Sequence, residues 1–207
     1  MKYKKHRSRE WRKEKHHMAK KKKLTIMSSV IIVIMISSVF AIMIYGFDAP
    51  GTVENYNGYR FTYTQQGLSV NVDGTNYFFE WLPQDVETGN VDSNAATLLR
   101  NAQGVTITSE FDSVFSQDIA FAYYLTTEVL ANNNKYTMGA YTQETGEIPV
   151  ATCDDATSTN PVIQYKEAVL LPQVRTEGSC IVVEFDSASD IQRLTHNMLY
   201  QYLGIIQ

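Results

Sequence analysis

The chain has 207 residues, of which 44% are hydrophobic and 19% charged, and its formal net charge at pH 7 is −4. This length holds about one folded domain, and 13 Tyr, 9 Phe and 2 Trp exclude a chain that is disordered throughout. The charge is unevenly distributed, because residues 1–23 carry +10 and the remainder carries −14. We expect the acidic part to repel nucleic acid and anionic lipid, which excludes it as a nucleic-acid-binding module.

The basic arm, residues 1–23, is followed by 22 residues (24–45) that include no charged residue and no His, Asn, Gln, Pro or Gly. As a helix this segment would be roughly 33 Å long, and the hydrocarbon core of a bilayer is about 30 Å thick. We therefore predict a transmembrane helix over residues 24–46.

The Lys and Arg residues beside this helix predict its orientation, since they resist translocation. We expect a single-pass protein of the cell membrane, with the arm in the cytoplasm and the carboxyl-terminal domain outside. A cleavable signal peptide is the alternative, but its apolar core would be about 7 to 15 residues long. The longer run here, followed by Gly46, Phe47 and Asp48, favours an uncleaved anchor.

Two further contacts at the membrane are compatible with the sequence. The basic arm could bind anionic lipid head groups, at about 1 kcal/mol per basic residue near the surface; it could instead contact a nucleic acid or simply be solvated. Ser37 and Ala41 form a small-xxx-small pair at which a second copy of the helix could approach. A homo-oligomer is therefore one of the expectations.

Residues 47–53 are predicted to form a tether and residues 54–207 an exported domain, which opens with β-strands. Apolar and polar residues alternate over 59–64 and again over 68–72, and a period of two indicates strands. Asp73-Gly74 is typical of a two-residue type I′ hairpin. The chain should then return over 75–82, which completes a three-stranded antiparallel meander.

A helix is predicted over residues 93–102, which carry apolar residues at helical spacing after a capping residue, Asp92 or Ser93. Three elements should follow it: a strand at 105–109, a helix at 117–131 and a strand at 136–142. A strand, a helix and a strand in this succession imply a parallel strand pair.

The last third should contain four extended segments and a helix. The extended segments are 148–153, 162–165, 169–174 and 180–185. The helix begins at Ser187 or Ser189, and one of its faces is apolar: Ile191, Leu194, Met198, Tyr202 and Ile205. His196 lies outside that face and should be solvated.

The predicted fold class is α+β, a transmembrane helix followed by one exported domain with a mixed sheet and about three helices.

Cys153 and Cys180 are the only cysteines. Outside the cytoplasm an even count favours a disulfide, and closing this loop would stabilise the fold by about 3.5 kcal/mol in the chain-entropy model. A zinc site would need paired ligands, and a catalytic thiol would need a His, of which the domain has only His196.

Residues 153–160 are rich in side-chain oxygens, but the ligand spacing of a calcium-binding loop is absent, and a turn accounts for them. The sequence shows no known catalytic or cofactor-binding motif. We therefore predict no catalytic, cofactor-binding or metal-ligating residue.

Four stretches carry a resemblance: T-C-D-D-A-T (152–157), P-V-I (161–163), G-S-C-I-V-V (178–183), and D-I-Q-R-L with L-Y-Q-Y-L-G-I within 190–205. They resemble small archaeal membrane-anchored proteins that have an exported α/β domain. The resemblance implies the membrane topology and a disulfide, and it implies no activity.

The function predicted from these features is that of a membrane-anchored exported domain without catalysis, an interaction or structural module. Its acidic charge restricts the expected partners to neutral or basic protein surfaces, cations or glycans. A pilin-like structural subunit is one alternative. The other is an extracytoplasmic hydrolase, which would require convergence of several carboxylates from one set: Asp112, Asp118, Asp154, Asp155, Glu177 and Asp190.

Overall fold

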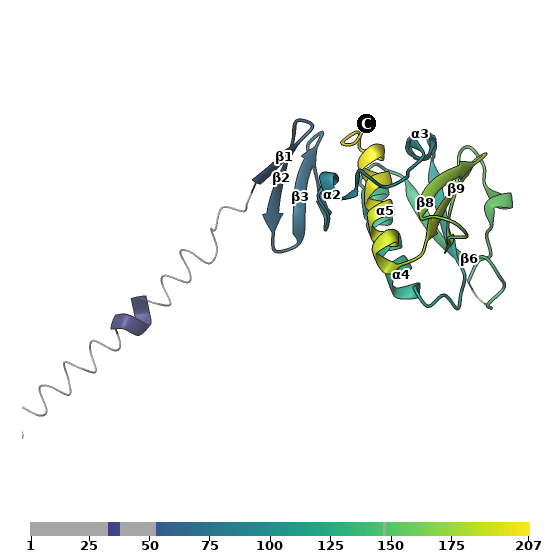
Figure 1. Ribbon diagram of the computed structural model, residues 1–207, viewed down its shortest axis with the longest axis horizontal. Coiled ribbons are helices and arrows are strands. Elements are labelled where there is room, and N and C mark those ends of the chain that lie inside the picture. Colours follow the sequence, from purple (N-terminus) through teal and green to yellow (C-terminus); the bar gives the residue numbers. More distant parts are fainter. Residues whose placement is uncertain (1–32, 38–52, 147) are drawn as a thin grey trace, which may run out of the picture. The chain divides into compact units, whose positions relative to one another are not determined.

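The computed structural model describes residues 33–37, 53–146 and 148–207 (Figure 1). Residues 33–37 are helical. The rest of the predicted transmembrane helix (24–46), the basic arm (1–23) and almost all of the predicted tether (47–53) lie outside the described residues. Within the described part of the chain, no helix is long and apolar enough to cross a membrane.

The domain begins with an antiparallel sheet, called here the amino-terminal sheet. Its strands pair in chain order: β1 (Val53–Tyr56), β2 (Tyr59–Thr64), β3 (Gly67–Val72) and β4 (Thr75–Phe79). The predicted meander is confirmed, and β1 adds a fourth strand. The turns at Asn57-Gly58 and Asp73-Gly74 have positive φ at both residues, with φ of 47° and 85° in the first and 50° and 88° in the second, as a type I′ turn requires.

A second sheet, called here the mixed sheet, has the strand order β6-β5-β7-β9-β8. Four strands are parallel and β8 runs antiparallel to β9: β5 (Gly104–Ser109), β6 (Tyr136–Tyr141), β7 (Val162–Glu167), β8 (Gln173–Glu177) and β9 (Cys180–Phe185). The fold is α+β, as predicted, but it has two sheets rather than one.

The meander ends before Pro83, which has no N–H to donate to a ladder and instead starts the short helix α2 (Pro83–Val86).

The three predicted helices of the domain are confirmed as α3 (Ser93–Asn101), α4 (Ser116–Ala131) and α5 (Ala188–Tyr202). The side chains of Asp92 and Ser187 cap α3 and α5 by accepting hydrogen bonds from the N–H groups of Asn94 and Asp190.

Two of the predicted extended segments differ from the structure. In 148–153, Val150 forms only an isolated bridge with Tyr141, and Cys153 begins a 3₁₀-helix, η1 (Cys153–Asp155). In 169–174 the strand starts only at Gln173. The residues before it, Val169, Leu170 and Leu171, are exposed and form a loop.

Helix α5 lies between the two sheets (Figure 1). On one side the ring of Tyr200 lies 5.9 Å from that of Phe61 and 4.3 Å from that of Phe79 in the amino-terminal sheet. On the other side α5 contacts β8 and β9 of the mixed sheet. Every residue from Leu194 to Tyr200 is consequently buried. The prediction of a solvated His196 is therefore wrong: this side chain is 0% exposed.

The two faces of the mixed sheet are covered differently. Side chains such as Ile163 and Ile181 join the main core with α3, α4 and α5, whereas the alternate residues Val162 and Val182 form a second cluster against Cys153 and Ala156. The predicted disulfide is confirmed, with 5.2 Å between the Cα atoms of Cys153 and Cys180. The disulfide links η1 to the face of the mixed sheet opposite α3, α4 and α5.

Candidate functional site

The carboxylates named for a hydrolase do not gather in a cleft. Of the six, only Asp190 lines any of four pockets of the described residues. Three have local structural partners: Asp155 accepts from the N–H of Thr152, Asp190 from the hydroxyl of Ser187, and Glu177 pairs with Arg175. Across the described part of the chain, no group of three or more His, Cys, Asp or Glu side chains could hold a metal ion.

The oxygen-rich segment 153–160 forms turns. Asp155 and Thr152 make a capping box at η1. The N–H of Asn160 donates to the hydroxyl of Thr157 at 3.0 Å, and the N–H of Thr157 donates to the carbonyl of Asn160 at 3.1 Å. The interpretation of this segment as a turn is confirmed.

His196 is a structural residue that connects α5 to the end of β4. Its Nε2 accepts a hydrogen bond of 3.2 Å from the N–H of Glu80, so the other ring nitrogen, Nδ1, carries the proton and donates to the carbonyl of Gln192 at 2.7 Å. Burial lowers the pKa of His196 to about 4. The imidazole is therefore neutral at physiological pH.

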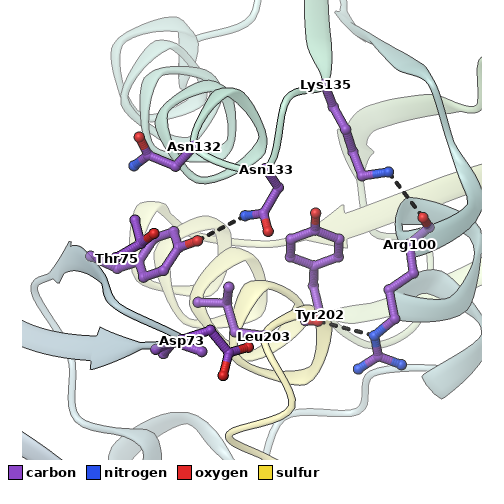
Figure 2. Close-up of a pocket in the computed structure, with 10 residues that line it drawn as sticks. Asp73, Thr75, Arg100, Asn132, Asn133, Lys135, Tyr202 and Leu203 are labelled. Atoms are coloured by element: carbon purple, nitrogen blue, oxygen red, sulfur yellow. Dashed lines mark hydrogen bonds between the residues drawn. The ribbon is translucent and has the colours of Figure 1, made fainter.

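A polar pocket of about 390 Å³ opens where α3, α4 and α5 end, beside the β3–β4 turn (Figure 2). It is lined by polar side chains from four parts of the chain: Asp73, Thr75, Tyr77, Arg100, Asn132, Asn133, Lys135 and Tyr202. The amide of Asn133 donates to the hydroxyl of Tyr77 at 2.9 Å, which fixes the chain after α4 against the amino-terminal sheet.

Two cations of the polar pocket cap helix ends. Nε of Arg100 donates to the carbonyl of Tyr202 at 3.0 Å, and a second guanidinium nitrogen donates to that of Gln201. Nζ of Lys135 donates to the carbonyls of Arg100 (2.9 Å) and Ala102. A positive charge at a helix carboxyl terminus is stabilising. Among the described residues, neither cation forms an ion pair with a carboxylate.

A second, more apolar cavity of about 360 Å³ lies between α4 and β6, and we call it the α4–β6 groove. Tyr123, Gly139 and Tyr141 are among the residues that line it, and Phe111 packs edge to face on Tyr141 at 5.2 Å. A Cβ added at Gly139 would lie 3.6 Å from the ring of Tyr123. Glu110 is the only charged residue in the lining.

β6 is an edge strand of the mixed sheet. At the carboxyl end of β6, the N–H and C=O groups of Tyr141 point away from β5. The N–H donates to the carbonyl of Pro149 and the C=O accepts from the N–H of Ala151, both at 2.9 Å. Because backbone direction alternates along a strand, Thr137 and Gly139 point the same way. Their outward N–H and C=O groups have no partner among the described residues.

The sequence predicted a strand at 136–142 but neither its place at the sheet edge nor the groove beside it. The one signal in the sequence was Gly139, since a glycine inside a strand often marks the close approach of another group.

We compared the chain with models of protein families, with curated proteins and with solved structures, and none matched. The resemblance of residues 152–205 to archaeal membrane-anchored proteins gains no support from these comparisons. Function is therefore inferred from the α4–β6 groove and the polar pocket.

Proposed function

We propose that this protein is a single-pass membrane protein whose exported domain, residues 54–207, binds an extended segment of a partner protein along β6. In this proposal the domain is a non-catalytic interaction module. A strand of the partner pairs with the outer edge of β6, and one of its side chains enters the α4–β6 groove.

The observation that carries this proposal is the open backbone edge beside a groove. An extended peptide can add a strand to an exposed sheet edge, where main-chain hydrogen bonds give affinity and a pocket for alternate side chains gives specificity. The outward groups of Thr137 and Gly139 would supply these bonds. Gly139 has no side chain, so the groove beside it is open to an apolar side chain of the partner.

The charge of the domain favours a partner segment with basic residues. No Lys or Arg lines the groove, Glu110 does, and Asp118 lies in the first turn of α4 beside it. The chain after residue 23 carries −14. Complementary charge speeds association and rejects partners of like charge, so we expect an apolar side chain flanked by Lys or Arg.

Membrane anchoring is supported by the sequence and by the disulfide. Residues 24–45 are long enough and apolar enough to span a bilayer, and the basic arm favours a cytoplasmic amino terminus. The Cys153–Cys180 disulfide suits a domain exposed to an oxidising compartment.

The binding proposal is tested by selecting peptides from a random library on the full-length protein in lipid nanodiscs. We expect selected peptides to carry one apolar residue flanked by Lys or Arg and to lose at least tenfold in affinity for Gly139→Leu, whose side chain fills the groove. Gly139→Ala is the matched control, because its Cβ fits at ordinary contact distance. Equal affinity for both variants, or selection of acidic peptides, would overturn the proposal.

The topology is tested separately by adding protease to intact cells. Digestion of the domain after residue 46, with the basic arm protected, is the expected result. Protection of the domain would reverse the proposed orientation.

A further inference from the structure

Tyr202 lines the polar pocket, and its hydroxyl has no protein partner among the described residues. The side chain is 7% exposed, and its oxygen makes no hydrogen bond within the described part of the chain. In Figure 2 its hydroxyl points to the space between the side chains of Asn133 and Lys135, and the guanidinium of Arg100 lies at the opposite end of the ring. The oxygen is not among the buried polar atoms that lack a partner in the described residues, so it is open to solvent in the pocket, where a ligand could accept its hydrogen bond.

This hydroxyl is a donor over the whole physiological pH range. Burial raises the pKa of Tyr202 to about 12, with the neighbouring Tyr77 as a smaller cause. The phenol therefore keeps its proton and favours an acceptor, above all a negatively charged oxygen.

Arg100 and Lys135 concentrate positive charge in the same pocket. Only six Lys and Arg residues follow residue 53, and two of them line this pocket. The described ion pairs instead join Lys166 and Arg175 to Glu184 and Glu177. A guanidinium has five N–H donors and an ammonium three, so both cations keep donors free after capping their helices. Asp73, on the exposed turn, is the one carboxylate in the lining.

We propose that the polar pocket binds a small polar molecule through an oxyanion, a carboxylate or phosphate group held by the Tyr202 hydroxyl and the Lys135 ammonium, with the more distant charge of Arg100 adding to the attraction. Arg and Lys are the side chains that bind such groups in proteins. The cavity of about 390 Å³ fits a small molecule. The site is separate from the α4–β6 groove and does not depend on the proposed peptide binding.

The direct test is calorimetric titration of the full-length protein in lipid nanodiscs with inorganic phosphate, with citrate and with uncharged glycerol. Saturable binding of phosphate or citrate, and none of glycerol, is the expected result, and the stronger of the two anions identifies the oxyanion. If neither anion binds saturably up to tens of millimolar, Arg100 and Lys135 act only as helix caps and the proposal is wrong.

Tyr202→Phe assigns the binding to this pocket, because it removes one oxygen and leaves the ring in place. We expect it to weaken anion binding at least fivefold. Tyr124→Phe, the same change on an exposed tyrosine outside the pocket, should leave binding unchanged. Anion affinity equal to that of the wild type in Tyr202→Phe would overturn the assignment.

A second variant covers the case in which Tyr202→Phe lowers the melting temperature. Asn132 is exposed, lines the pocket and makes no side-chain hydrogen bond within the described residues. Asn132→Asp adds a negative charge there without a change in size. It should weaken anion binding at least fivefold and lower the melting temperature only slightly, because the added charge is exposed at the carboxyl end of α4. Unaltered affinity would again contradict the proposal.

Discussion

The N–H of Glu80, directly after β4, donates a hydrogen bond of 3.2 Å to Nε2 of His196 on α5. The bond joins the amino-terminal sheet to the central helix and requires the neutral imidazole, because a protonated ring has no acceptor nitrogen. Stability of the domain should therefore depend on pH through this one residue in addition to its carboxylates.

His196 should make the domain less stable in mild acid. Burial lowers its pKa from the ordinary value of 6.5, which the unfolded chain retains, to about 4 in the folded domain, so the unfolded chain binds the proton first. The stabilisation is complete above pH 6.5 and is lost progressively between pH 6.5 and pH 4, at about 1.4 kcal/mol per pH unit. Urea unfolding between pH 7 and pH 4.5 measures this slope.

The matched variant for this prediction is His196→Gln, which does not titrate. It should be less stable than the wild type at pH 7 and show a smaller pH slope between 6.5 and 4.5. Parallel slopes for the two proteins would mean that His196 does not cause the pH dependence.

Phe79 should contribute far more to stability than its neighbour Phe78. The ring of Phe79 is 2% exposed and lies 4.3 Å from that of Tyr200, whereas Phe78 is only half-buried on the opposite face of β4. Phe79→Ala should lower the free energy of unfolding by about 3–5 kcal/mol. Chemical denaturation of both alanine variants checks this, and equal losses would show that α5 does not pack on the amino-terminal sheet.

Removal of the disulfide should destabilise the domain without changing its fold. Replacing both Cys153 and Cys180 by Ser should lower the free energy of unfolding by about 3.5 kcal/mol, because the unfolded chain regains the freedom of the closed loop. A reducing agent should lower the melting temperature of the wild type and leave that of the double variant unchanged. Two free thiols in protein isolated under non-reducing conditions would contradict the prediction.

The two glycines of the β3–β4 hairpin and of β6 should respond differently to alanine. Gly74 has φ of +88° with open space around it, so Gly74→Ala meets only backbone strain of about 1–2 kcal/mol. Gly139 has no positive φ, and Gly139→Ala should change stability little. Thermal unfolding of the two variants compares them, and a comparable loss in Gly139→Ala would show that the α4–β6 groove is already filled.

The sequence by itself determined the local elements of the domain. Asp73-Gly74 identified a type I′ turn because both residues need positive φ. Asp92 or Ser93 and Ser187 or Ser189 were the candidate starts of two helices, and in the structure Asp92 and Ser187 cap the free N–H groups. Asn57-Gly58 carried the same turn signal and was missed. The even number of cysteines predicted the Cys153–Cys180 disulfide. These features depend on the dihedral preferences and bonding of neighbouring residues, which a short segment fixes.

The tertiary structure alone decided the burial of His196 and the composition of both candidate sites. A helix that packs on one sheet shows one apolar face, but α5 contacts a sheet on each side, so a polar residue off the apolar face is buried. Likewise Arg100, Lys135 and Tyr202 come from three distant segments, and β6 becomes an edge only through the order of the strands. Packing between distant parts of the chain sets these relationships, and no local pattern of residues encodes them.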